Sequence, residues 1–323
     1  MKKIKILTVC VLILSCLSLL NAADMKSKVG ITPIGSVFGS NGQVFPKDVA
    51  RFVVKGISFT KDTAYDGNNE VTDPIHREVQ MNKLNFLFRY GLGNNFDIRM
   101  IVPYVSKEMK QTYPMGPNAG KELKLKNSGM GDSKVFIRYQ ALNQKKGDPV
   151  LLALGLGLKL PTGTTSKVFT TIQGKKETPT MQLGSGSLDI IAEIGLTKIL
   201  PNSRIDAHTS YILKNKGSNN YEFGDQIHWN IGYVYSLNKY LGLGAELNGV
   251  HMNKDKSNGN TIDNSGGNFI FFTPGIQYRP NKSYDISLAY AHMIYRNNNY
   301  NSMANSGGLS EDNRIVFRVG YNF

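Results

Sequence analysis

The sequence predicts an all-β fold: a single antiparallel transmembrane barrel of about twelve strands, of the bacterial outer-membrane type. Three observations predict it. Apolar and polar residues alternate in a series of segments of roughly ten residues. The connections between these segments alternate between short and long. The chain ends on a strand, 314–323, whose apolar face closes with Tyr321 and Phe323.

Residues 1–23 have the pattern of a secretory signal peptide. Three lysines precede an apolar run over residues 6–20, and alanines at 22–23 offer a cleavage site. A lipoprotein signal with Cys16 as the lipidated residue is the alternative, but the apolar run continues past Cys16. Cys10 also lies in this segment, so signal cleavage leaves no thiol in the mature chain. Disulfides, thiolate metal sites and cysteine nucleophiles are then excluded.

The composition of the mature chain suits short alternating strands. No apolar run after residue 23 approaches the ~20 residues that a membrane helix needs. The mean hydropathy is −0.26, yet the chain contains 33 Gly, 16 Tyr and 15 Phe. Signal removal takes the formal charge from +14 to about +11. In an exported protein, nucleic acid explains this charge poorly, so we expect it to line the lumen and to meet outer-membrane lipid and anionic lipopolysaccharide.

Residues 24–48 are irregular and contain Pro33 and Pro46. A periplasmic arm, a plug in the lumen and a short extra strand pair are all compatible with this segment. The barrel itself is expected over residues 49–323, without an internal domain boundary.

Twelve strands are expected in order, each with its apolar set toward lipid and its polar set toward the lumen. Leucines alternating with Ala153, Gly155, Gly157 and Lys159 make 150–161 the clearest of them. The first is ambiguous, because its basic residues share a face with apolar ones. The strands are predicted at 50–60, 79–90, 95–105, 133–142, 150–161, 188–197, 204–214, 226–235, 241–248, 268–278, 284–295 and 314–323.

Loop length gives an independent test. The connections predicted as short are 91–94, 143–149, 201–203, 238–239 and 279–283. Those predicted as long and polar are 61–76, 106–131, 162–186, 215–221, 253–267 and 296–312. Bacterial barrels have short periplasmic turns, long outer loops and periplasmic termini, whereas a soluble sandwich has no reason to alternate strictly. The last strand resembles the Phe-terminated strand of such barrels, so Tyr321 and Phe323 are the expected signal for the barrel-assembly machinery.

The polar faces define a predicted lumen lining that is mostly charged. Beside Lys83 it comprises Arg89, Asp97, Arg99, Lys134, Arg138, Lys159, Asp189, Glu193, Asp206, His208, His228, Glu246, Arg314 and Arg318. Basic residues dominate strands two to five and the last strand, and acidic ones lie on strands six to nine. Closure would place a basic wall opposite a more acidic one. These charges either neutralise one another in a narrow interior or form a polar conduit, with small residues such as Gly155 leaving space; barrel size does not decide.

Catalysis is disfavoured by geometry. Asp206, His208 and Ser210 supply triad residue types on one strand face. Residues two apart on a strand lie roughly 6.5–7 Å apart at Cα, whereas a nucleophile and its base need about 2.6–3.2 Å. No oxyanion hole accompanies them. We therefore expect lumen lining and no enzymatic activity.

No metal or cofactor is expected. Asp66, Glu70 and Asp73 enclose Gly67-Asn68-Asn69, which is typical of a solvated turn. The run 253–259 fails as a calcium loop because Lys254 would be its first ligand. Gly155 and Gly157 lie inside a strand, so they form no nucleotide-binding fingerprint.

Several turn and strand-end motifs resemble those of the meta-pathway phenol-degradation outer-membrane family. They are Gly131-Asp132, Gly157-Leu-Lys-Leu-Pro-Thr-Gly163, Gly184-Ser-Gly-Ser-Leu-Asp189 and Pro274-Gly-Ile-Gln-Tyr278. The likeness runs from about residue 58 to the end. It implies outer-membrane channels or transporters associated with aromatic catabolism, and it brings no catalytic residues.

The expected function is an outer-membrane channel for small solutes, aromatic or anionic. Basic residues outnumber acidic ones in the predicted lining, so anions should be favoured over cations. A surface-exposed binding or adhesion barrel with a closed lumen is the alternative, because the loops are long and rich in Asn and Lys.

Overall fold

The computed structural model describes residues 35–171, 174–299 and 308–323. The predicted signal peptide, both cysteines and residues 24–34 lie outside the described residues.

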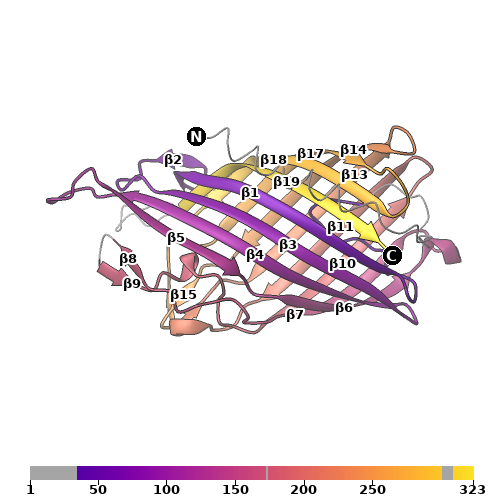
Figure 1. Ribbon diagram of the computed structural model, residues 1–323, viewed down its shortest axis with the longest axis horizontal. Helices are drawn as coiled ribbons and strands as arrows, with labels where there is room; N and C mark the ends of the chain where they lie inside the picture. Colours follow the sequence, from indigo (N-terminus) through magenta and orange to yellow (C-terminus); the bar gives the residue numbers. More distant parts are fainter. Residues whose placement is uncertain (1–34, 172–173, 300–307) are drawn as a thin grey trace.

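Within the described residues, twelve antiparallel strands close into one barrel, which confirms the predicted fold (Figure 1). The ring consists of β1 (Ala50–Asp66), β3 (Glu78–Gly93), β4 (Phe96–Thr112), β6 (Lys134–Leu142), β7 (Leu151–Lys159), β10 (Asp189–Ile199), β11 (Ser203–Leu213), β13 (Gln226–Ser236), β14 (Leu241–Met252), β17 (Gly267–Tyr278), β18 (Tyr284–Asn298) and β19 (Gly308–Asn322). The first and last strands pair from Arg51↔Asn322 to Tyr65↔Gly308, so the ring has no open edge.

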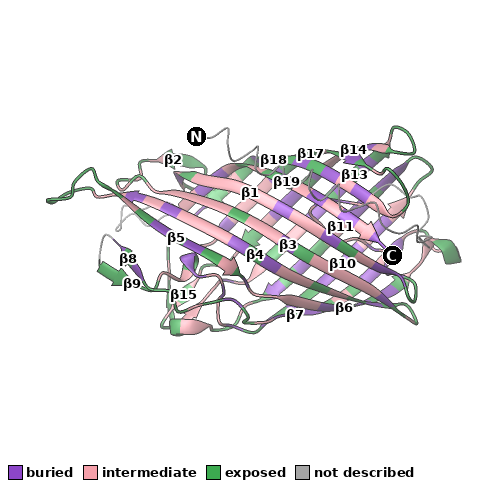
Figure 2. Ribbon diagram, in the orientation of Figure 1, coloured by how far each residue is buried: buried purple, intermediate pink, exposed green. Residues whose placement is uncertain are grey.

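Side-chain burial is the inverse of that in a soluble barrel, and it follows the period-two pattern of each strand (Figure 2). Leu156 is 58% exposed and Ile231 55% on the outer face, while Asp97 and Asp189 are 0% exposed on the inner face. Apolar residues outside and charges inside are favourable only where the outer surface meets lipid. In the described part of the chain, no helix is long and apolar enough to span a membrane.

The two ends of the barrel differ as predicted. The end that holds Ala50 and Phe323, the periplasmic end, has the short connections 94–95, 143–150, 200–202, 237–240 and 279–283. Asn94 and Asn95 make the tightest turn, with φ of 50° and 67°. Asn tolerates this left-handed region, which a two-residue hairpin turn of the I′ type requires at both positions. The six remaining connections, at the outer end, are longer.

The outer loops contain structure that the sequence reading missed. β5 (Glu122–Met130) pairs with β4 from Tyr104 to Thr112, inside a segment predicted as a loop. Its alternation is reversed: Lys124 and Lys126 face outward, whereas Leu125 is buried against Met109, Phe169 and Met181. The reversal has a physical cause. Beyond the bilayer the outer face meets water, so apolar residues turn inward.

The outer loops also carry short elements. These are β2 (Asn69–Val71), β8 (Phe169–Thr171), β9 (Gly174–Lys176), β12 (Tyr221–Glu222), β15 (Lys256–Ser257), β16 (Asn260–Thr261) and the 3-10 turns η2 (Pro179–Met181) and η3 (Ser218–Asn220). A further 3-10 turn, η1 (Gln144–Lys146), lies at the periplasmic end.

Contacts in the structure show which face of β1 points into the lumen, which the sequence left ambiguous. The Arg51 guanidinium lies 2.6 Å from Asp285, and Lys55 donates to the backbone carbonyl of Val37 at 2.9 Å. Both side chains therefore point inward, together with Val53 on the same face.

Candidate functional site in the barrel lumen

Ion pairs cross the periplasmic half of the lumen, and they join neighbouring strands as well as strands two or three places apart in the ring. Arg89 lies 2.5 Å from Asp97, and Arg99 lies 2.7 Å from Glu193. Arg138, 1% exposed, approaches the other oxygen of Glu193 at 3.1 Å. Basic and acidic residues of the predicted walls thus meet instead of facing each other across a gap. In this half of the lumen, the neutralising arrangement is the one that the chain adopts.

Gly155 explains how Arg138 reaches Glu193 from two strands away. In register, Arg138 on β6 lies opposite Gly155 on β7, which lies opposite Glu193 on β10. A Cβ at Gly155 would stand 2.5 Å from Glu193 Cγ. The expectation that Gly155 and Gly157 leave open space is therefore wrong. Glu193 occupies the first gap, and Phe136 occupies the second.

Three further ion pairs lie in this half. Asp285 lies 2.6 Å from Arg51 and 3.7 Å from Arg318. The Arg204 guanidinium lies 2.9 Å from Asp206.

Residues 35–48, which form no strand, run through the same half of the lumen. Six of their backbone N–H groups donate to barrel side chains: Ser36 to Asp206, Val37 and Phe38 to Glu246, Gly42 to Thr197, Val44 to Gln140 and Phe45 to Asp97. Carboxylates and amides that line the lumen are therefore engaged by this N-terminal segment.

Barrel side chains also donate to the carbonyls of the N-terminal segment. Arg318 bonds to the carbonyl of Ser36 at 2.8 Å, and Gln140 bonds to that of Gly42 at 2.6 Å. Arg89 and Arg138 donate to the carbonyl of Gln43. Val37 and Phe38 pack on apolar inner-wall residues of β1, β18 and β19, among them Val316, which is 0% exposed. The segment is thus held by polar and apolar contacts from most of the ring.

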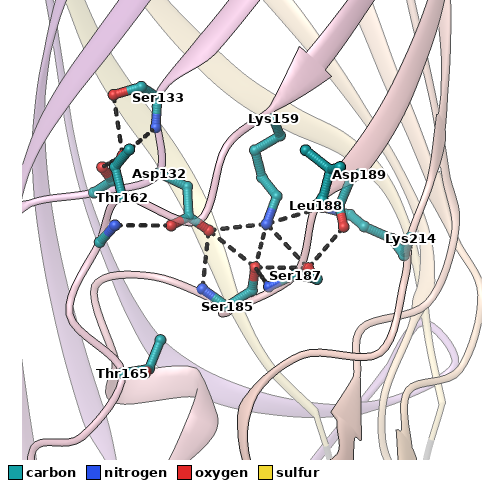
Figure 3. Close-up of polar contacts among 12 residues, drawn as sticks. Asp132, Ser133, Lys159, Thr162, Thr165, Ser185, Ser187, Leu188, Asp189 and Lys214 are labelled. Carbon is teal, nitrogen blue, oxygen red and sulfur yellow. Dashed lines mark hydrogen bonds and ion pairs between the residues drawn. The ribbon is translucent and has the colours of Figure 1, made fainter.

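A polar cluster forms around Asp132, in the connection between β5 and β6 (Figure 3). Asp132 accepts hydrogen bonds from the backbone of Gly163 at 3.0 Å and of Ser185 at 2.9 Å. Lys159 lies 2.9 Å from Asp132 and 3.2 Å from Asp189, and it donates to Ser185 and Ser187. Three of the four motifs quoted for the family resemblance therefore meet at this cluster, which fastens loop 160–188 to the barrel.

Lys159 and Asp189 were predicted to line the lumen, and both are buried in this polar cluster. Lys159 is 4% exposed, and Lys214 reaches Asp189 at 3.0 Å.

The outer half of the lumen is different, because basic residues there have few counter-charges. Lys83 and Lys134 have no hydrogen bond or ion pair with any other described residue. His228 contacts Gln226 at 3.0 Å, with roles that depend on the tautomer. Arg314 pairs with Glu311 at 2.7 Å and lies 4.1 Å from the Phe271 ring centroid. This is the part of the predicted lining that carries unbalanced positive charge.

The triad residue types do not assemble. His208 Nε2 lies 3.5 Å from Glu193, and Asp206 is occupied by Arg204 and by the backbone of Ser36. No hydrogen bond joins His208 to Ser210 or Asp206 among the described residues. Nor do those residues include a group of three or more His, Cys, Asp or Glu that could hold a metal.

A pocket of about 370 Å³ opens at the periplasmic end. Its lining includes Asn202, Val234, Tyr240, Gln277 and Arg279. Gln277 also donates to the carbonyl of Gly35 at 3.3 Å, so the N-terminal segment borders this pocket.

Sequence reasoning placed the charged lining but missed several of its partners. Four of these partners hydrogen-bond to the N-terminal segment. Thr197, Gln140 and Lys55 bond to its backbone, and Asn230 bonds to the Ser36 hydroxyl. The inward position of Thr197, Gln140 and Asn230 followed from strand alternation, whereas that of Lys55 did not. What they bind did not, because residues 35–48 have no periodic pattern.

Solved structures with a similar fold are outer-membrane barrels. An outer-membrane channel from Pseudomonas putida F1 matches with a TM-score of 0.63 at 15% identity, covering 89% of this chain and 100% of that one. The monoaromatic hydrocarbon channel CymD (TM-score 0.41, 8% identity, 86% of this chain and 88% of that one) and a Pseudomonas aeruginosa FadL homologue (0.41, 11%, 86% and 90%) match more weakly.

A search of curated proteins gave no match. The family model described as "Putative MetA-pathway of phenol degradation" matches residues 58–300, three quarters of the sequence. The polar cluster at Asp132 and most strands of the ring lie within that range. The chain therefore belongs to this phenol-degradation family of outer-membrane barrels.

Proposed function

We propose that the protein is an outer-membrane channel for small solutes, and that residues 35–48 are a plug that closes its periplasmic half. The observation that carries the proposal is the contrast between the two halves of the lumen. Ion pairs and the plug fill the periplasmic half, whereas the outer half holds Lys83 and Lys134 without counter-charge. Charges that line a pore set its selectivity, so anions are favoured over cations.

The plug is built to be displaceable. Six of its backbone N–H groups bond to side chains rather than to a strand ladder. Each such bond contributes about 0.5–1.5 kcal/mol, or about 1.5–3 kcal/mol with a charged partner. Glu246 holds two amides, those of Val37 and Phe38. It also accepts from Asn230 at 2.9 Å. Weakening this anchor should raise the population of open channels.

Single-channel conductance of the refolded mature protein in planar bilayers tests the proposal. We expect rare openings for the wild type, more frequent openings for Glu246→Gln, and unchanged behaviour for the exposed-loop control Asp263→Asn. Deletion of residues 35–47 should give a constantly open channel with a preference for anions. If that deletion variant folds and does not conduct, the channel proposal is wrong. If deletion leaves the wild-type conductance unchanged, the plug proposal alone is wrong.

A binding or adhesion barrel with a closed lumen is the second candidate, because the plug contacts so much of the ring. Cell or ligand binding through the outer loops, without conductance in the wild type or the deletion variant, would favour it.

We further propose that the protein has no catalytic activity, in keeping with the separation of His208 from Ser210. Export through residues 1–23, recognition of Tyr321 and Phe323 by the barrel-assembly machinery, and contact with lipopolysaccharide complete the proposed cellular setting. Hydrolysis of an ester or phospholipid that His208→Ala abolishes would contradict the first of these statements.

A further inference from the structure

The outer half of the lumen brings together four basic side chains from four strands. Lys83 lies on β3, Lys134 on β6, His228 on β13 and Arg314 on β19. Lys83 is within electrostatic range of Arg314, and His228 is within range of both Lys134 and Arg314. Lys134 is also within range of Lys83. These four residues and Phe59 are called the outer chamber.

The outer chamber lies directly outward of the plug. His228 is two residues beyond Asn230, which accepts from the Ser36 hydroxyl. Lys134 and Arg314 are each four residues beyond a plug contact, Arg138 and Arg318 respectively. At about 3.3 Å per residue, these positions lie roughly 7–13 Å along their strands from those plug contacts. The Phe38 side chain of the plug packs against the cluster that contains Phe271, so it forms the floor of the outer chamber. A solute that entered from outside would reach these cations before it met the plug.

One wall of the outer chamber is apolar. Lys83 lies opposite Ile57 in the β1–β3 register, and Arg314 lies opposite Phe59 in the β1–β19 register. Residues directly opposite share a face, so the cations and apolar side chains are neighbours. The Arg314 guanidinium lies 5.3 Å from the Phe59 ring centroid and 4.1 Å from that of Phe271. An apolar body placed here would contact Ile57, Phe59 and the flat face of a guanidinium.

The electrostatic balance of the outer chamber is incomplete without an anion. Arg314 has Glu311, but among the described residues Lys83 and Lys134 have no hydrogen-bond or ion-pair partner. The charged groups that act on them electrostatically include other cations. Like charges in a confined site repel, and a bound carboxylate would relieve that repulsion with charge-assisted hydrogen bonds. Inorganic phosphate would satisfy the cations but would gain nothing from the apolar wall.

We propose that the outer chamber is a binding site for a small organic carboxylate with an apolar body, with the carboxylate between Lys83 and Lys134 and the body against Phe59 and Arg314. The proposal deepens the proposed channel function, in that it names the class of solute held above the plug. It stands or falls separately, because binding to the chamber needs no open path to the periplasm.

Isothermal titration calorimetry on the folded, detergent-solubilised mature protein tests the proposal, with benzoate as the probe. Benzyl alcohol lacks the charge and phosphate lacks the apolar body. We expect benzoate to bind at least tenfold more tightly than either. The double variant Lys83→Gln/Lys134→Gln should weaken benzoate binding at least tenfold. The control Lys145→Gln/Lys146→Gln, which removes the same charge from the exposed turn η1, should leave it unchanged.

Loss of the two unpaired lysines removes repulsion, so the double variant should fold. Phe59→Leu provides a second test and should weaken benzoate binding while leaving phosphate binding unaltered. Absence of benzoate binding, equal affinity for phosphate, or unchanged affinity in the lysine double variant would overturn the proposal. Conductance without benzoate binding would refute the binding site and leave the channel standing. Benzoate binding without conductance in the plug-deleted protein would support the binding site and refute the channel.

Discussion

Replacement of Asp132 by Asn should destabilise the barrel far more than replacement of an exposed carboxylate. Asp132 accepts from the backbone of Gly163 and Ser185 and from the Ser185 hydroxyl, each at 2.9–3.0 Å, and pairs with Lys159 at 2.9 Å. An Asn side chain keeps one acceptor and turns a donor toward groups that are themselves donors. In either rotamer it loses at least one backbone bond and the charge opposite Lys159.

The magnitude follows from these contacts. A hydrogen bond to a charged group contributes about 1.5–3 kcal/mol, and breaking a buried ion pair costs about 3–5 kcal/mol. Lys159 retains Asp189 at 3.2 Å, which limits the loss. We therefore expect Asp132→Asn to lower the free energy of unfolding by about 2–4 kcal/mol. The control, Asp263→Asn, removes a carboxylate that is 61% exposed and should cost no more than about 1 kcal/mol.

Equilibrium guanidinium unfolding in detergent micelles measures the difference. The single tryptophan, Trp229, reports unfolding by fluorescence, since it lies on the outer face of β13 and passes from detergent to water. Equal unfolding midpoints for the two variants would refute the assignment of the Asp132 cluster as the fastening of loop 160–188. A lower midpoint for Asp132→Asn with unchanged loop proteolysis would show that the cluster stabilises the wall alone.

Three further predictions concern topology, packing and assembly. An epitope inserted in loop 253–266 should be accessible on intact cells and one at 238–239 should be protected; the reverse pattern would invert the barrel. Gly155→Val should separate Arg138 from Glu193 and destabilise the fold by about 1–3 kcal/mol, as expected for an overpacked site. The temperature at which the folded form is lost on gels should fall. An unchanged temperature would mean that the ion pair does not depend on the missing side chain of Gly155. Deletion of Phe323, whose ring lies 5.5 Å from that of Tyr321, should reduce the folded protein in outer-membrane fractions while the purified variant still refolds; normal membrane levels would count against a C-terminal assembly signal.

Strand alternation made the ring predictable, because a lipid-facing surface leaves an unambiguous apolar period of two. The leucines of β7 are the clearest case. The same template failed for β5, whose alternation is reversed above the bilayer: Leu125 turns inward where Lys124 and Lys126 meet water. A rule that equates apolar with outward therefore finds only the strand portions inside the membrane.

The sequence predicted which residues point into the lumen, but it did not predict which of them contact one another. Arg138 and Glu193 were both placed inside, yet their pairing depends on the missing side chain of Gly155 between them, which is a property of three aligned strands. The path of residues 35–48 had no local signal either. Its amides are satisfied by Asp206, Glu246 and Asp97, which come from distant parts of the chain.

Those long-range contacts bear on the order in which the molecule forms. The N-terminal segment is bonded to residues from β1, β3, β4, β6, β10, β11, β13, β14, β17 and β19. Partners on adjacent hairpin strands meet early, but those on opposite sides of the ring come together only when the ring has curled and β1 has met β19. Contacts between residues so far apart in the sequence form late, because the entropy cost of loop closure must be met first. Residues 35–48 should therefore dock last, and their contacts stabilise the closed ring without helping it to close.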